Sequence, residues 1–167
     1  MSTLPRAPAA VIAAFALSSC GIFISSHHDP LAYKEIHAAA QAGDLAKVTE
    51  LYRRDHGVVN AKEWDNLTPL HLAVLHRHSD VVDWLLNHKA NANAKTSKGI
   101  TALHYAAQVG DADSARLLLK HHAEINAVDA NSWTPLDRAL KWHQTKLAAF
   151  LQNHGGKTHS ERLRPSS

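Results

Sequence analysis

Short groups of apolar residues alternate with polar residues along the chain at the spacing of helical faces. The clearest group lies in the sequence DVVDWLL, where Val81, Val82, Leu85 and Leu86 occupy one side of a predicted helix. We place Trp84 at a core leucine position of the same helix. The apolar side of this helix requires a neighbouring element to cover it.

A shorter helix is predicted just before it. Thr68 can cap the exposed amides at a helix start, and Pro69 suits the first helical position, where its missing N–H costs nothing. After the longer helix, the sequence ANANA and the residues up to the next threonine are rich in turn formers and lack helical periodicity. The unit is therefore helix, turn, helix and extended loop.

This unit repeats with a period of 33 residues. His71 and His104 keep the period, and Asp137 takes the third place. Threonines, leucines and asparagines keep it through three units: Thr68, Thr101 and Thr134; Leu70, Leu103 and Leu136; Asn60, Asn93 and Asn126. A fixed period of this length indicates stacked supersecondary units.

The segments NLTPLHLAV, GITALHYAAQVGD and SWTPLDRAL resemble successive ankyrin repeats, whose pattern is T-P-L-H-x-A-A followed by G-A-D-x-N-A. The resemblance covers residues 33–157 and implies an all-α solenoid of about four helix-turn-helix repeats joined by β-hairpin-like loops. The expected repeats are 33–61, 62–94, 95–127 and 128–157. The first is degenerate, because the sequence IHAA at Ile36 stands for L-H-A-A and one extra residue lies near positions 55–58.

Four positions depart from the family pattern. The glycine that normally ends the second helix is Lys89 in one repeat and His122 in the next. The glycine between the two helices is replaced by Arg77 and His143. A left-handed backbone at Lys89 and His122 would cost each about 1 kcal/mol, and the changes at Arg77 and His143 affect the turn between the helices.

The start of the chain has the features of a secretory signal. Residues 1–8 contain Arg6 and no acid, residues 9–17 are apolar without a break, and two small serines follow. The apolar run is too short to span a bilayer, which takes about 20 residues. The sequence LSSC that ends at Cys20 resembles the lipobox of bacterial lipoproteins, in which cleavage precedes the cysteine and the thiol receives a lipid.

Cys20 is the only cysteine in the chain, so it forms no internal disulfide. The resemblance implies a signal peptide over 1–19, a lipidated Cys20 and a tether over 20–32. Gly21, in place of aspartate, favours the outer membrane over the inner one. We therefore expect a lipid-anchored protein of the bacterial cell envelope that faces the periplasm. Two alternatives are an ordinary signal peptide cleaved nearby and a structural or reactive thiol.

The charge of the chain does not indicate a nucleic-acid partner. Without residues 1–19 the chain keeps 17 lysines and arginines against 15 acids, and the basic residues are scattered rather than clustered. Residues 158–167 are polar and basic, and we expect a disordered tail there. With no second cysteine, apolar packing must supply the stability.

Fourteen histidines raise the question of metal binding or catalysis. In ankyrin repeats the T-P-L-H imidazole, here His71 and His104, bonds to the backbone and orders the loop. His88, His121 and His154 also recur every 33 residues, but repeats stack about 10 Å apart, so one metal ion could not collect all three. We predict no cofactor and no metal site; a histidine-rich metal-binding protein is the third functional alternative.

Catalytic motifs are missing from the sequence. There is no G-x-S-x-G elbow, no phosphate-binding glycine loop and no H-E-x-x-H. We therefore predict that the protein is not an enzyme.

Solenoids of this kind present an extended concave surface to partners. In ankyrin repeats the contact positions are the loop tips and the exposed side of the first helix. By register these are Trp64, Asp65, Leu67, Leu75 and His76; Ser97, Lys98, Ile100, Gln108 and Val109; and Ala130, Asn131, Trp133, Lys141 and Trp142. Tryptophan is frequent among interface anchors, which predicts a face that binds another protein. The alternative for Trp64 and Trp133 is packing between adjacent loops.

The combination of a lipid anchor, a repeat domain and no catalysis resembles the lipoproteins that neutralise secreted toxic enzymes. The expected function is therefore that of a periplasmic immunity protein, which binds and inhibits a secreted effector such as a phospholipase. The alternative is a scaffold or stabiliser of a resident periplasmic enzyme or envelope complex.

Overall fold

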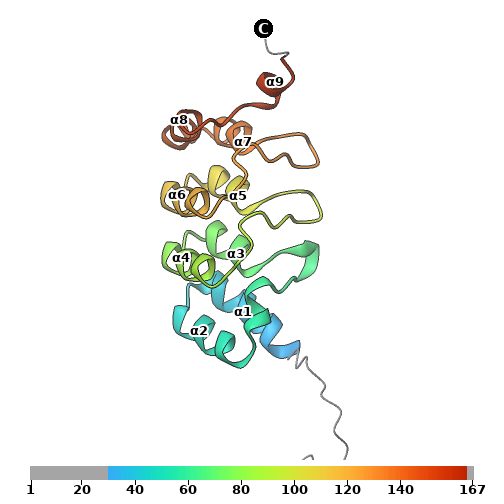
Figure 1. The fold of residues 1–167 in the computed structure, drawn as a ribbon, viewed down its shortest axis with the longest axis vertical. Coiled ribbons are helices and arrows are strands. Elements are labelled where there is room, and N and C mark those ends of the chain that lie inside the picture. Colours follow the sequence, from blue (N-terminus) through green and yellow to red (C-terminus); the bar gives the residue numbers. More distant parts are fainter. Residues whose placement is uncertain (1–29, 165–167) are drawn as a thin grey trace, which may run out of the picture.

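The computed structural model describes residues 30–164, which form four helical layers along one long axis (Figure 1). The first helices of the layers are α1 (Pro30–Ala42), α3 (Pro69–Leu75), α5 (Ala102–Val109) and α7 (Pro135–Lys141). The second helices are α2 (Leu45–Arg54), α4 (Ser79–Asn87), α6 (Ala112–Lys120) and α8 (Thr145–Asn153). Two 3-10 turns, η1 (His56–Asn60) and η2 (Trp64–Asn66), and a short α9 (His159–Arg162) complete the described part, which contains no strand. The all-α solenoid of about four helix-turn-helix repeats is confirmed.

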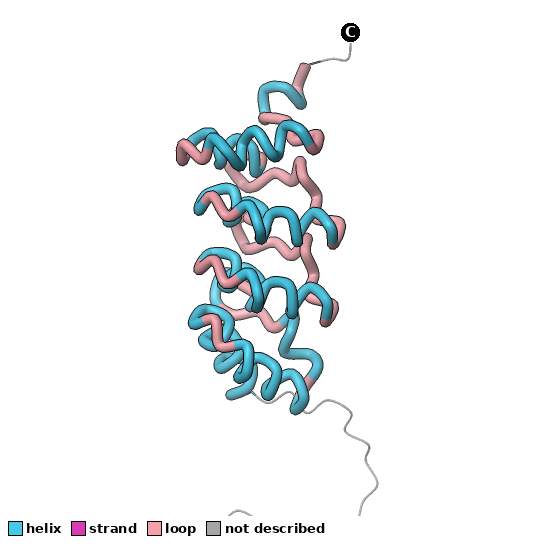
Figure 2. The backbone as a smooth tube through the Cα atoms, turned by 90° about the vertical axis from the view of Figure 1, so that its left-hand side faces the viewer, coloured by secondary structure: helices cyan, strands magenta, loops and turns pink. Residues whose placement is uncertain are grey.

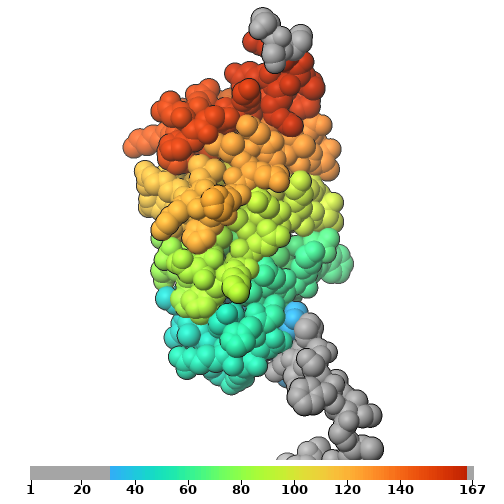
Figure 3. All heavy atoms as spheres, viewed as in Figure 1, coloured from blue at the N-terminus to red at the C-terminus, as the bar shows by residue number. Residues whose placement is uncertain are grey.

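Two rows of helices make the body of the stack. Each first helix packs on the first helix of the next layer, and the second helices form an outer row from α2 to α8 (Figure 2). The core lies between the rows and is built from leucines that keep the 33-residue period, all 1% exposed or less: Leu70, Leu85, Leu103, Leu118, Leu136 and Leu151. In the space-filling view the layers appear as successive bands (Figure 3).

The first helices of the second, third and fourth repeats begin at capping boxes. Thr68, Thr101 and Thr134 are the N-caps of α3, α5 and α7, and the third residue of each helix bonds back to the threonine amide. In the fourth repeat that residue is Asp137, whose Oδ2 accepts from the Thr134 N–H (2.8 Å) and from the His159 N–H (2.9 Å). Asp137 thereby links α7 to α9.

Asparagines at the 33-residue period join each repeat to the next. Each side chain donates to one backbone carbonyl and accepts from one backbone N–H in the turn that follows the second helix of the next repeat. The pairs are Asn60 with Lys89 and Asn91, Asn93 with His122 and Glu124, and Asn126 with Gly155 and Lys157, at 2.7–3.0 Å. The sequence shows the period of these asparagines, and the structure shows what they bind.

Trp84 does not occupy a core position, and that prediction is wrong. Leu85 is fully buried, whereas Trp84 is half-buried and packs on the rings of Tyr52 (5.2 Å between centroids) and His88 (3.7 Å). The predicted apolar side of the helix is confirmed, because Val81, Val82, Leu85 and Leu86 are all buried. Trp84 therefore bridges the outer surfaces of α2 and α4.

Both ends of the repeat domain extend beyond the predicted boundaries. Helix α1 begins at Pro30, inside the segment expected to be a tether, and Ala32 is already buried. At the other end, Thr158 and Glu161 form a capping box that starts α9 within the expected disordered tail. The signal segment and Cys20 lie outside the described residues. None of the helices in 30–164 is long and apolar enough to cross a membrane.

The four residues that replace family glycines do adopt the left-handed backbone. The φ angles are 63° at Arg77, 69° at Lys89, 62° at His122 and 56° at His143. Each of these positions follows a helix, where an L-residue in this conformation is strained. The chain therefore stores about 1 kcal/mol at each position.

Replacing Lys89 and His122 by glycine is expected to stabilise the fold by about 0.5–1 kcal/mol each, because the strain disappears while the exposed side chains contribute little packing. Urea unfolding followed by circular dichroism measures the change. The matched control is Asn87→Gly at the end of α4, which relieves no left-handed strain and should not stabilise the fold. Destabilisation by Lys89→Gly would contradict the argument.

Candidate functional site

The loops between repeats stack on one side of the molecule (Figure 1). The N–H of Ser97 donates to the carbonyl of Asp65 (2.9 Å), and the N–H of Ala130 donates to the carbonyl of Lys98 (2.8 Å). Each loop is also closed on itself like a hairpin, for example by the Thr96 N–H and the Ile100 carbonyl (2.9 Å). We call these loops, residues 62–67, 95–100 and 128–133, the hairpin wall.

Side chains inside the hairpins fix their tips. Asp129 Oδ1 accepts from the backbone N–H groups of Asn131 (2.8 Å) and Trp133 (3.0 Å). Thr96 Oγ1 accepts from the N–H groups of the two equivalent residues in the preceding hairpin, at 3.2–3.3 Å. The tips are therefore held in one conformation before any partner binds, which lowers the entropic cost of binding.

Buried histidines join the first helices to the loops. His104 Nε2 donates to the Trp133 carbonyl (3.0 Å), and His71 Nε2 donates to the Ala94 carbonyl (3.1 Å). Nδ1 of each ring accepts from the backbone N–H of the capping threonine (3.1 Å), which requires the neutral ring. Burial lowers the pKa of both histidines to about 4. The family role expected for these residues matches their geometry.

Trp64 stands alone at the tip of the first hairpin, with 89% of its surface exposed. The two residues after it, Asp65 and Asn66, are both left-handed (φ 66° and 58°). Equivalent tip positions hold the small residues Ser97 and Ala130. Such exposure shows that the alternative, packing of Trp64 between adjacent loops, is wrong.

A second aromatic group lies in the fourth repeat. Trp133 on the hairpin and Trp142 at the end of α7 meet edge to face, with 6.1 Å between ring centroids. Lys141 Nζ lies 5.5 Å from the centre of the Trp133 ring, and the Arg138 guanidinium lies 5.8 Å from that of Trp142. Trp142 is 39% exposed and Trp133 is half-buried. These contacts join the hairpin wall to the first-helix row.

The matching family model describes ankyrin repeats (3 copies) and covers residues 17–96, 36–129 and 91–161 in overlapping matches. The chain belongs to the ankyrin-repeat family. No curated protein matches the chain significantly. Ankyrin repeats are protein-protein interaction modules, so this chain carries a surface that binds another protein, and proteins of this family are generally not catalytic.

The predicted contact residues of this ankyrin-repeat protein all keep accessible surface. Trp64, His76, Ser97, Lys98, Ala130, Asn131, Lys141 and Trp142 are exposed. Asp65, Leu67, Leu75, Ile100, Gln108, Val109 and Trp133 are half-buried. All lie on the hairpin wall or at the C-terminal ends of α3, α5 and α7. They form the candidate binding face, and their contact with a partner stays a prediction.

Sequence reasoning missed two half-buried residues beside the face, Leu72 and Tyr105, and the buried Arg138. The three share one position of the first helix, two residues after the periodic leucine and just before an alanine. Tyr105 is half-buried, and burial, followed by the charge of Asp65, raises its pKa, while Arg138 opposes the rise. Variation at this place, between a leucine and an alanine that recur in each unit, is the signal that could have found these residues.

Arg138 is the centre of a buried polar network. It donates to Asp129 Oδ2 through Nη2 (2.8 Å) and to Gln108 Oε1 through Nη1 (2.9 Å). The side chains of Arg138 and Asp129 are only 8% and 1% exposed. Burial by itself would raise the pKa of Asp129, but the Arg138 hydrogen bond and the hairpin N–H groups hold it below its usual value.

Histidine clusters do not assemble into a metal site in the described part of the chain. Among residues 30–164 no group of three or more histidine, cysteine, aspartate or glutamate side chains is placed to hold an ion. His88 and His154 instead bond through Nδ1 to the carbonyls four residues earlier, at 2.7 and 2.8 Å.

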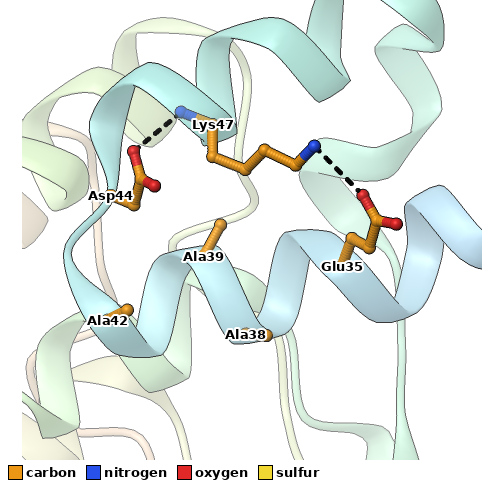
Figure 4. A pocket seen from close by; sticks show the side chains of 6 residues that line it. All are labelled: Glu35, Ala38, Ala39, Ala42, Asp44 and Lys47. Atoms are coloured by element: carbon orange, nitrogen blue, oxygen red, sulfur yellow. Dashed lines mark hydrogen bonds and ion pairs between the residues drawn. The ribbon is translucent and has the colours of Figure 1, made fainter.

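A shallow depression lies at the other end of the stack, between α1 and α2 (Figure 4). It is floored by three alanines, Ala38, Ala39 and Ala42. Lys47 spans it, with Nζ 3.3 Å from Glu35. The depression lacks both the aromatic side chains and the unpaired charge of the candidate binding face.

Proposed function

We propose that this ankyrin-repeat protein is a membrane-tethered periplasmic immunity protein. In this proposal Cys20 carries the lipid, and the binding face captures and inhibits a secreted toxic enzyme such as an envelope-attacking phospholipase. The signal-like start of the chain supports the location. The pre-formed hairpin wall supports tight binding without catalysis.

The observation that carries the binding role is the exposure of Trp64. An indole is mostly buried in folded proteins, since it is the side chain with the largest apolar surface. Serine and alanine at the equivalent tips show that the hairpin fold does not require an indole there. The backbone after it also differs from that of the other hairpins: Asp65 is left-handed (φ 66°), whereas the left-handed conformation of Asn66 is shared by Gly99 and Ser132.

Trp64→Ala is expected to leave the free energy of unfolding within about 0.5 kcal/mol of wild type and to weaken partner binding at least about tenfold. Urea unfolding and titration of the co-purified partner measure the two quantities. Leu163→Ala is the matched control, because Leu163 is an exposed apolar residue (69%) on the C-terminal segment. Unchanged affinity of a folded Trp64→Ala protein for the partner would show that Trp64 is not part of the binding site.

Gene deletion distinguishes inhibition from scaffolding. If the protein neutralises a toxin, cells that lack it die, and deletion of the toxin gene rescues them. If it scaffolds a resident enzyme, the activity of that enzyme falls and no second deletion restores growth. The second result would replace the immunity role with the scaffold role.

Cys20→Ser is expected to move the protein from the membrane fraction to the soluble fraction, or to stop its processing. Each buried methylene of an acyl chain contributes about 0.8 kcal/mol, so two or more chains anchor a protein stably. Fractionation and labelling with a radioactive fatty acid measure this, with Ser25→Ala as the control. Membrane association of Cys20→Ser without label would exclude the lipid anchor.

A further inference from the structure

Two lysines of the candidate binding face have no acidic partner. Lys98 is exposed on the middle hairpin, and Lys141 is exposed at the end of α7. Within residues 30–164 neither forms an ion pair. Lys141 Nζ instead faces the ring of Trp133.

The acids of the fourth repeat near Lys141 are already engaged. Asp129 pairs with Arg138 and is 1% exposed. Asp137 Oδ2 accepts from Thr134 and from the His159 N–H. The fourth-repeat end of the face therefore combines free positive charge with two aromatic rings.

The second-repeat end of the face has a different character. Trp64 is exposed, and Leu67, Leu72 and Leu75 are half-buried on the hairpin and on α3. This end offers apolar surface, and the charged residues of its hairpin, Lys62, Glu63 and Asp65, sum to a net negative charge. The face thus changes from apolar to basic along the stack.

We infer that the face binds an acidic segment of a protein, with carboxylates at Lys98 and Lys141 and an apolar side chain against Trp64 and Leu67. The inference rests on the proposed role of the face as the partner-binding site. Lys98 lies one repeat from Trp64 and Lys141 lies two repeats from it, about 10 and 20 Å at the usual spacing of packed helices. An extended segment covers that distance in about six residues.

A protein fits this surface better than a lipid membrane. A flat anionic surface would meet the hairpin tips first, where Glu63 and Asp65 flank Trp64 and repel phosphate groups. Lys141 lies at the end of α7 rather than at a hairpin tip, so a protruding protein segment reaches it more readily than a plane does. Carboxylates on a flexible protein chain can avoid the acidic tip and still reach Lys141.

The first test uses charge reversal in the full-length lipidated protein. Lys98→Glu with Lys141→Glu is compared with Lys120→Glu with Lys146→Glu, an equal charge change on the outer helices α6 and α8. The face variant should lose about tenfold or more in affinity for the co-purified partner, and the wild-type affinity should fall with added salt. The outer variant should stay within about twofold of wild type.

Trp64→Ala separates the failure of this inference from the failure of the proposed function. Loss of binding by Trp64→Ala but not by the lysine reversal keeps the face as a binding site and overturns the acidic segment. Binding retained by both variants overturns both. Equal losses in the face and outer reversals also overturn the inference, because they reflect net charge alone.

A defined probe completes the test. We would use a fluorescent twelve-residue peptide with one leucine and, six residues later, a run of glutamates, beside its glutamine counterpart. The full chain carrying Cys20→Ser should bind the glutamate peptide about tenfold more tightly. Equal binding of the two peptides, or no binding, overturns the inference. Sedimentation with phosphatidylglycerol vesicles that depends on Lys98 and Lys141 would assign the lysines to lipid and overturn it too.

Discussion

Replacing Arg138 by methionine should lower the free energy of unfolding by about 3 kcal/mol or more, because it leaves the Asp129 carboxylate buried without its counter-ion. Methionine keeps most of the apolar stem of arginine, so the loss reports the charge rather than a cavity. The hairpin N–H groups still bond to Oδ1 and limit the damage.

Urea unfolding measures this change, and two further variants show its cause. Arg116→Met removes an exposed arginine paired with Asp113 and should cost less than about 1 kcal/mol. Adding Asp129→Asn to Arg138→Met should recover part of the loss, since no uncompensated charge remains. Equal costs for Arg116→Met and Arg138→Met would show that the buried pair contributes nothing special.

Acidification from pH 7 to about pH 4 should destabilise the fold through His71 and His104. Burial lowers the pKa of both to about 4 from an ordinary value of 6.5. Below pH 6.5 the two histidines of the unfolded chain bind protons, whereas the buried rings of the native state stay neutral down to about pH 4. The stabilisation that the neutral rings provide is therefore complete above about pH 6.5 and is lost as the pH falls towards 4. The pKa difference corresponds to about 3 kcal/mol for each ring.

Unfolding in urea at several pH values between 7 and 4 measures this dependence. His104→Gln should reduce the slope of the unfolding free energy against pH by the equivalent of about one bound proton. His122→Gln changes an exposed histidine and should leave that slope as in wild type. Identical slopes for His104→Gln and wild type would mean that the buried imidazole binds protons equally in both states.

The 33-residue period was sufficient to predict the fold. Capping threonines, the first proline and the paired leucines each have a local reason for their position, and these reasons agree in successive repeats. The same register placed the candidate face, because exposed positions lie at fixed offsets from the threonine. The left-handed backbone at Lys89 and His122 also followed from the pattern.

Features that depend on one particular contact could not be predicted from the 33-residue period. The Arg138 network joins residues 9 and 30 positions apart, and no periodic signal pairs them. Trp84 was misplaced because its burial depends on packing against Tyr52 of the neighbouring helix, a contact that the repeat pattern does not encode. Helix α9 is anchored by the bond between His159 and Asp137, which composition alone does not reveal.

The asparagine bonds imply that the binding face can be lengthened in whole units. A duplicate of residues 95–127, inserted after position 127, would supply the turn groups that Asn126 binds and would present its own asparagine to Gly155 and Lys157. The insertion would move Trp142 away from Trp64 by about 10 Å. The number of repeats would therefore set the distance between the two ends of the face. A partner that contacts both ends would lose its contact with one of them in the lengthened protein.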